Sequence, residues 1–194
     1  LPKYQVGDSW TVRFADGRTA TRKVRAIEKD QYVFEWGLDL WRYLDRDLVL
    51  SRQITPIDGK EFPSYLEKQR LIDFPLSVNK TWEFRILVGT GRAGQAGGPG
   101  MTVIRYWRVF SFKVFGTETI LTPAGTFGAF KIGESSREIA CGAAGTCEDV
   151  ANTLIVGHLW YAPEVKSFVK VKRVSGGATR EQEPDYELVA FDLK

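Results

Sequence analysis

The stretch Val6-Gly7-Asp8-Ser9-Trp10-Thr11-Val12-Arg13 returns 72 residues later as Val78-Asn79-Lys80-Thr81-Trp82-Glu83-Phe84-Arg85. Valine, tryptophan and arginine hold the same positions in both copies, and a hydroxyl residue precedes each tryptophan. An internal repeat of this kind indicates two similar units built from one strand pattern. We expect the equivalent residues Trp10 and Trp82 to be core anchors that fill matching places in the two units.

Strand signals continue along the rest of the chain, for example at Gln31–Trp36, at short intervals and with turn residues between them. No convincing amphipathic helix of ten or more residues interrupts them. This pattern predicts an all-β fold made of two related antiparallel lobes, each resembling a half-barrel or open barrel, packed as one unit. A single continuous sheet shared by strands of both lobes is compatible with this pattern. The predicted division is a first lobe at residues 1–55, a connecting segment at 56–77 and a second lobe at 78–194. Within the connecting segment, Pro63–Arg70 is compatible with one or two helical turns.

Composition limits the classes of function. The chain has 194 residues, of which 43% are hydrophobic and 13% aromatic, as expected of a β-rich chain with a buried core. A formal net charge of +3 is too small to indicate a nucleic-acid partner. No run of eighteen or more apolar residues predicts a transmembrane segment.

Cys141 and Cys147 are the only cysteines, and they enclose five small residues. An even number of cysteines in a short loop favours a disulfide, and therefore an oxidising compartment. The alternative is a pair of free thiols in a cytosolic protein. The first residue is Leu1 rather than Met, which is typical of a chain whose leader has been removed; a sequence that starts at an arbitrary boundary is the alternative.

Motifs for catalysis or cofactors are weak. Gly89–Gly94 matches the pattern GxGxxG, but the following glycines and proline cannot begin the helix that a dinucleotide needs. We therefore expect the glycine-rich segment 89–100 to be a hairpin loop. His158 is the only histidine and has no nucleophile motif around it, so a structural or solvent-facing role is expected. Carboxylates that could pair as in a glycosidase are numerous, but nothing selects among them: Glu118, Glu134, Glu138 and Glu164. The sequence predicts no catalytic residues, no metal ligands and no cofactor.

Aromatic and basic residues are the better candidates for binding. Trp36, Trp41, Trp107 and Trp160 could stack on a sugar ring or line an apolar cavity. A candidate basic face consists of Arg105, Arg108, Lys170 and Lys172; a solvated strand face is the alternative. If these residues converged with Arg22, Lys23 and Arg25, they could bind an anionic glycan or lipid headgroup.

Four segments of the second half carry a family resemblance: Pro75–Trp82, Thr122–Phe127, Trp160–Val165 and Glu187–Phe191. Together they resemble the TapB-like family of exported bacterial proteins of unknown function. The resemblance implies a β-rich protein of the bacterial periplasm or cell surface, and it supplies no catalytic residues. Asn79 and Lys166 stand where the family pattern has glycine, and residues 134–152 form an insertion, predicted to be a loop, that carries both cysteines.

Three functional hypotheses follow. The first is a non-enzymatic exported envelope protein, a structural or accessory subunit of a surface assembly with a protein partner or a second copy of itself. The second is a periplasmic carrier or sensor that holds a lipid or other apolar ligand between its sheets. The third is a glycan-processing enzyme.

Overall fold

The computed structural model describes residues 1–194 except 38–39, 55–68, 94–101, 143–144 and 176–184. The described residues form strands, turns and one short 3-10 helix. The strands are β1 (Ser9–Phe14), β2 (Thr19–Glu28), β3 (Gln31–Trp36), β4 (Leu40–Asp45), β5 (Val49–Ile54), β6 (Gln69–Arg70), β7 (Thr81–Ala93), β8 (Thr102–Thr122), β9 (Gly125–Cys141), β10 (Cys147–Ala162), β11 (Ser167–Ser175) and β12 (Tyr186–Asp192). The 3-10 helix η1 (Pro163–Val165) links β10 to β11.

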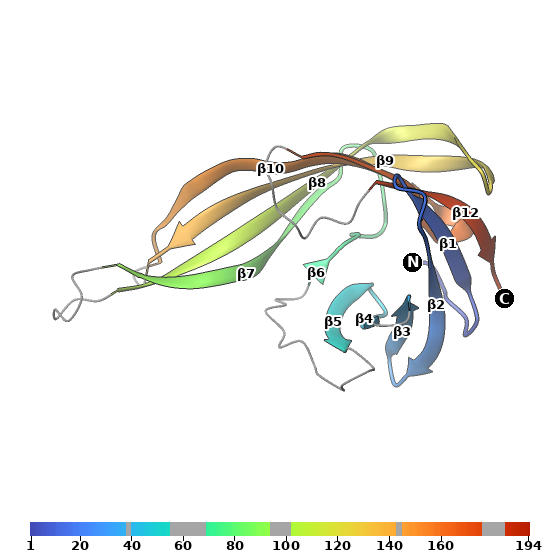
Figure 1. Ribbon diagram of the computed structural model, residues 1–194, viewed down its shortest axis with the longest axis horizontal. Coiled ribbons are helices and arrows are strands. Elements are labelled where there is room, and N and C mark those ends of the chain that lie inside the picture. Colours follow the sequence, from blue (N-terminus) through green and yellow to red (C-terminus); the bar gives the residue numbers. More distant parts are fainter. Residues whose placement is uncertain (38–39, 55–68, 94–101, 143–144, 176–184) are drawn as a thin grey trace.

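All twelve strands belong to one antiparallel sheet, in the order β6-β5-β4-β3-β2-β1-β12-β11-β10-β9-β8-β7. The predicted all-β fold is confirmed. The sheet passes from the first repeat to the second through the pairing of β1 with β12, in which Trp10 lies opposite Phe191. The sheet curls into a nearly closed barrel (Figure 1). Its two edge strands are joined where the Trp82 indole Nε1 donates to the Arg70 carbonyl at 3.1 Å.

The two hairpins β7–β8 and β9–β10 extend well beyond the curled part of the sheet. In Figure 1 they run to the left as an arm, while β1 to β5 curl below the sheet at the right. The arm arises from strand length, because β8 has 21 residues and β9 has 17, whereas β1 and β3 have 6 each.

The sequence repeat corresponds to one structural unit that occurs twice. Gly7 donates its backbone N–H to the Val24 carbonyl at 2.9 Å, and Asn79 donates to the Val114 carbonyl at 2.8 Å. Val24 and Val114 donate back to the residues that follow, Asp8 and Lys80. Gly7 and Asn79 both have a positive φ, of 100° and 67°. Each unit is therefore a left-handed turn that opens a strand and is fixed to the neighbouring strand.

Both repeat tryptophans are buried, with exposed fractions of 1% for Trp10 and 8% for Trp82. Trp10 Nε1 donates to the Val165 carbonyl at 2.5 Å, and its ring contacts that of Tyr4 edge-on at 5.6 Å. Trp82 stacks on Phe112, with ring centroids 5.1 Å apart. The same sequence position thus anchors η1 in the first unit and the edge strand β6 in the second.

The turn at Asn79 gives a direct test of the repeat. Asn79→Val should lower the free energy of unfolding by about 1–2 kcal/mol, because a β-branched residue is strained in the left-handed region. Asn79→Gly should leave the stability equal or slightly higher, because glycine adopts this conformation freely. The Asn79 side chain is exposed, so neither change disturbs the core. Urea unfolding measures both variants, and equal stabilities for the two would contradict the assignment.

Asp8 joins the two ends of the chain. Its carboxylate is completely buried and accepts backbone N–H groups from Lys194 at 2.8 Å and Gln5 at 3.0 Å. It also pairs with the Lys166 ammonium at 3.0 Å. Lys166 itself has a φ of 55°, a conformation that favours glycine. Asn79 and Lys166 therefore both adopt the left-handed conformation that glycine favours, although neither is glycine.

Three predicted local features need correction or lie outside the described residues. Residues 134–141 and 147–152 are not a loop but the ends of β9 and β10, because the hairpin pairing continues to Cys141 opposite Cys147. Residues 89–93 of the glycine-rich segment belong to β7, and 94–100 lie outside the described residues. The helical turns expected before Arg70 also fall outside them, except for Gln69–Arg70, which form β6.

Candidate functional site

The curled sheet holds an interior cavity of about 260 Å³. Every strand except β1 contributes at least one residue to its walls. Its lining combines aliphatic residues (Leu50, Leu71, Ile86 and Leu159) and aromatic residues with a polar set made up of Arg22, Arg42, Gln53, Gln69, Arg108, Glu134 and Arg173. A cavity that combines apolar walls with placed polar groups is the usual form of a small-molecule site.

One wall of the cavity is an aromatic ladder on β7 and β8. Phe84 lies opposite Phe110 in the register, and their rings stack with centroids 4.9 Å apart. Phe112 extends the ladder, 5.7 Å from Phe84. The three residues share a face because side chains on a strand alternate, so Phe110 and Phe112 project from the same side of β8.

Two ion pairs lie on the interior face. Arg173 Nε is 2.7 Å from Glu134 Oε2, and Arg108 Nη2 is 2.7 Å from Glu138 Oε1. Both arginines and Glu134 line the cavity. Each of these buried cations is therefore neutralised by a carboxylate on β9, as burial of a charge requires.

Arg22 also lines the cavity, in an environment different from those of Arg108 and Arg173. It lies between Trp10 and Trp36 in the registers of β1–β2 and β2–β3. Its guanidinium carbon is 4.7 Å from the Trp10 ring centroid and 5.1 Å from that of Phe34. Its Nη2 donates to the Ser167 hydroxyl at 3.0 Å. Its Nε is buried and has no hydrogen-bond acceptor among the described residues.

Two tyrosines behind this wall are held in their neutral form. Burial raises the pKa of Tyr4 to about 12, although the nearby Arg22 opposes the shift. Burial also raises the pKa of the Tyr161 hydroxyl, and Tyr4 adds to the effect. Tyr4 donates its hydroxyl proton to the Lys166 carbonyl at 2.9 Å. At neutral pH both side chains are therefore uncharged and do not balance the charge of Arg22.

The structure separates the four candidate tryptophans. Trp36 lines the cavity, where the Arg42 guanidinium lies 5.6 Å from its ring centroid. The other three lie on the opposite face of the sheet, because each projects on the side away from its cavity-lining neighbours. Their rings carry cations there: Arg25 over Trp41 at 4.4 Å, Arg85 over Trp107 at 4.5 Å, and Lys131 and Lys170 over Trp160 at 5.6 and 5.9 Å. Only Trp36 of this set belongs to the interior site.

The four candidate basic residues do not form one face. Arg105 and Arg108 are three residues apart in a regular part of β8 and so project from opposite sides of the sheet. Arg108 is the interior residue, whereas Arg105 is exposed on the arm. Lys170 and Lys172 share the outer face of β11, since the alternating Val169 and Val171 are buried. Lys170 is partly covered where it packs on Trp160, and Lys172 is exposed.

His158 lies on the outer face, where its ring is 5.9 Å from those of both Phe115 and Trp160. It contributes to an open groove of about 450 Å³ together with Phe115 and Val156. The Phe115 ring covers Gly133, where an added Cβ would lie 2.4 Å from Phe115 Cε2. The position of His158 is that of a packed surface residue.

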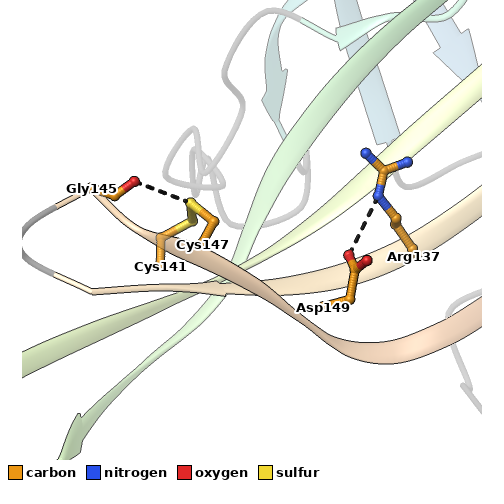
Figure 2. The surroundings of a disulfide bond; sticks show 5 residues. All are labelled: Arg137, Cys141, Gly145, Cys147 and Asp149. Atoms are coloured by element: carbon orange, nitrogen blue, oxygen red, sulfur yellow. Dashed lines mark hydrogen bonds and ion pairs between the residues drawn. A yellow bond between two sulfur atoms is a disulfide. The ribbon is translucent and has the colours of Figure 1, made fainter.

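Cys141 and Cys147 form a disulfide, with sulfur atoms 2.10 Å apart (Figure 2). It closes the β9–β10 hairpin at the end of the arm. Arg137, farther along β9, pairs with Asp149 of β10 at 3.6 Å. The hairpin end is thus fixed by a covalent bond and by one surface ion pair.

Neither metal ligands nor a helical membrane span is found within the described part of the chain. No group of three or more histidine, cysteine, aspartate or glutamate residues there could hold a metal ion. No described helix has the length and hydropathy needed to cross a membrane.

Sequence reasoning named Arg22 and Arg108 among basic residues that could bind an anion, but it grouped them with residues that the structure places on the outer face, and it did not pair Arg173 with Glu134. Arg22 carried a usable signal, because it occupies the middle of the alternating trio Ala20, Arg22 and Val24, whose valine is buried. The partners Glu134 and Arg173 are 39 residues apart and meet only through the pairings of β9, β10 and β11.

Comparisons with solved structures give three matches of low sequence identity. A Bacteroides fragilis protein described as exported, with a YmcC-like fold, is 15% identical with a TM-score of 0.40, covering 99% of this chain and 98% of that one. A Parabacteroides distasonis protein described as a lipoprotein is 14% identical with a TM-score of 0.39, covering 99% and 97%. The hypothetical lipoprotein YmcC from Escherichia coli is 9% identical with a TM-score of 0.36, covering 100% and 90%. No protein-family model and no curated protein matches the sequence. These matches do not assign the chain to a family.

Proposed function

We propose that the protein is an exported, non-enzymatic carrier or sensor that holds a small apolar ligand in its interior cavity. The observation that carries this proposal is the cavity itself, which is walled by aliphatic residues and by the stacked ring ladder of Phe84, Phe110 and Phe112. A sheet curled around such a space can exclude water from an apolar ligand.

The size of the cavity limits the ligand. Small-molecule sites are commonly about 300–1,000 Å³, and this cavity, at about 260 Å³, falls just below that range. A single hydrocarbon chain or one small ring system suits this space better than a lipid with several chains.

The disulfide supports export as part of the proposal. Structural disulfides persist in oxidising compartments such as the bacterial periplasm and are rare in the cytosol. Cys141 and Cys147 are bonded in the structure, and such a bond supports an oxidising location. The resemblance to the TapB-like family points to the same location, and membership of that family stays a prediction.

A second candidate function is that of a structural or accessory subunit. The observation that favours it is the projecting arm, on which three valines are substantially exposed: Val88, Val103 and Val150. Exposed apolar side chains that gather on one part of a surface are typical of protein contacts. Native mass spectrometry separates the two functions, because a carrier retains a small-molecule mass whereas a subunit retains a second protein chain.

Blocking the cavity tests the carrier function. Ile86→Trp should weaken binding of the neutral probe N-phenyl-1-naphthylamine by about tenfold or more, because the indole would occupy the space beside the ring ladder. Leu87→Trp is the matched control, since Leu87 is the next residue of β7 and lies opposite Trp107 on the outer face. Probe fluorescence measures both variants. Equal binding by the two, or no probe binding by the unmodified protein, would contradict a carrier function.

A further inference from the structure

We infer that Arg22 forms an anion-binding end of the cavity, so that the ligand is an anionic amphiphile: a carboxylate or phosphate group on a single hydrocarbon chain. The inference rests on the proposed carrier function and specifies its ligand. Arg22 differs from Arg108 and Arg173, which line the same cavity and are each paired with a glutamate.

The first step is the charge of Arg22. Arg108 and Arg173 each have a carboxylate oxygen at 2.7 Å. Across the described ranges of the chain, no carboxylate lies within ion-pair distance of Arg22. Its neighbours are aromatic rings and the neutral Ser167 hydroxyl. An arginine is charged at any physiological pH, so its positive charge in this wall lacks a described anionic partner.

The second step is the set of open donors. A guanidinium has five N–H groups, and Arg22 uses one of its terminal nitrogens on Ser167. Its Nε is buried without an acceptor among the described residues. A buried donor without an acceptor is costly, and it is rare in native proteins unless a bound group satisfies it. Among the described residues, the same is true of the Arg42 Nε, in the same cavity, and of the Ser136 hydroxyl, on the interior face where Ser136 lies opposite Phe110.

The third step is the geometry of recognition. The flat fork of a guanidinium matches two oxygens of a carboxylate or phosphate, which accept parallel hydrogen bonds from it. The rings of Trp10 and Phe34 hold the Arg22 guanidinium in place, so little freedom remains to be lost on binding. Phe84, Phe110 and Phe112 line the same cavity from β7 and β8, in the other half of the sheet order. The two groups of residues therefore offer a polar contact for a head and an apolar contact for a chain within one cavity.

Four ligands with the same eight-carbon chain test the inference: octanoate, octyl phosphate, 1-octanol and octylammonium. Displacement of N-phenyl-1-naphthylamine at pH 7 reports the affinity of each. We expect at least one of the two anions to bind about tenfold more tightly than octanol, as a charge-assisted hydrogen bond implies, and octylammonium to bind more weakly than octanol. The relative affinities of octanoate and octyl phosphate then identify the preferred head group. Acetate and inorganic phosphate should displace no probe, because they lack the hydrocarbon chain.

Arg22→Gln should abolish the preference for the anions over octanol, because it removes the charge and the fork of donors. Arg22→Lys should retain part of the preference, because it keeps the charge without the fork. Arg25→Gln is the matched control, since Arg25 is on the same strand but exposed and paired with Glu35 at 3.5 Å. If Arg22→Gln does not fold, as judged by circular dichroism, the anion preference of Arg22→Lys is compared with that of Arg25→Gln. A smaller preference in Arg22→Lys than in Arg25→Gln supports the role of Arg22, and equal preferences overturn it.

Different failures have different meanings. Equal binding of octanol and both anions by the unmodified protein would overturn the anionic ligand but leave the apolar carrier intact. An anion preference that survives Arg22→Gln would overturn the role of Arg22. Failure of all four ligands and of the probe to bind would overturn the carrier function itself, and the anionic ligand with it.

Discussion

Trp10→Ala should lower the free energy of unfolding by about 3–5 kcal/mol, which is the range for removing a large aromatic side chain from a core. Trp10 is 1% exposed, and its ring contacts Tyr4 and Phe34 as well as the Arg22 guanidinium. The substitution also leaves the Val165 carbonyl without its donor. A loss of this size is a large fraction of the stability of a typical domain, so partial unfolding at 25 °C is expected. Urea denaturation followed by circular dichroism measures the effect.

The equivalent tryptophan of the second repeat, Trp82, provides a comparison for Trp10→Ala. Trp82→Ala should cost less than Trp10→Ala, because Trp82 is 8% exposed and its main ring contact is Phe112 alone. It should also weaken probe binding, since Phe112 lines the cavity and loses its stacking partner. Trp10→Phe separates packing from hydrogen bonding, as it keeps the ring and removes the Nε1 donor. A smaller loss for Trp10→Ala than for Trp82→Ala would show that the two positions do not anchor the fold in the way their burial indicates.

Local features of this fold could be predicted from sequence because they depend on local chemistry. Alternation and turn residues bound β3 at Gln31–Trp36, the same limits that the structure shows. The repeat reflects a left-handed turn, which Gly7 and Asn79 adopt for reasons visible in the sequence. The short spacing of Cys141 and Cys147 likewise favoured the disulfide that is present.

Which side of the sheet a residue faces was harder to predict. The register of β8 against β9 shifts between Val114 and Gly116, and such a bulge changes the side from which the following residues project. Counting by twos along the sequence does not reveal this shift. The grouping of Arg105 with Arg108 failed for a simpler reason, because a spacing of three places two strand residues on opposite faces.

Pairing between distant strands was beyond the sequence altogether. The cavity exists because β1 pairs with β12 and because Trp82 joins the edge strands β6 and β7. Contacts of such long range leave no periodic signal in a single sequence. Arg22 could be recognised as unusual, an arginine at an interior position, but its position in a cavity wall required the closed sheet.

Asp8→Asn should be the second most damaging single change, lowering the free energy of unfolding by about 3–5 kcal/mol as expected when one partner of a buried ion pair is removed. The Asp8 carboxylate is completely buried and accepts hydrogen bonds from Gln5, Lys194 and Lys166. The amide of asparagine would present an N–H group to these donors and leave the Lys166 ammonium without its anion. Asp73→Asn is the matched control in the second repeat, because Asp73 pairs with Lys80, the residue equivalent to Asp8, but is 22% exposed. Because the Asp73 carboxylate keeps some contact with water, whereas that of Asp8 has none, Asp73→Asn should cost less than Asp8→Asn.

The dependence of stability on pH tests whether the loss of the Asp8 charge causes the destabilisation of Asp8→Asn. Burial alone would raise the pKa of Asp8, but the hydrogen bonds from Lys194 and Gln5, together with the Lys166 ammonium, lower the pKa below its usual value. A carboxylate with a lowered pKa in the folded state stabilises the fold fully above its unfolded pKa of about 3.9, and this contribution is lost as the pH falls through the folded value. The unmodified protein should therefore lose stability more steeply than Asp8→Asn between about pH 5 and pH 2, so that the difference between them narrows. Unfolding measured at several pH values tests this, and a difference that stays constant down to pH 2 would show that packing rather than the Asp8 charge holds the two ends of the chain together.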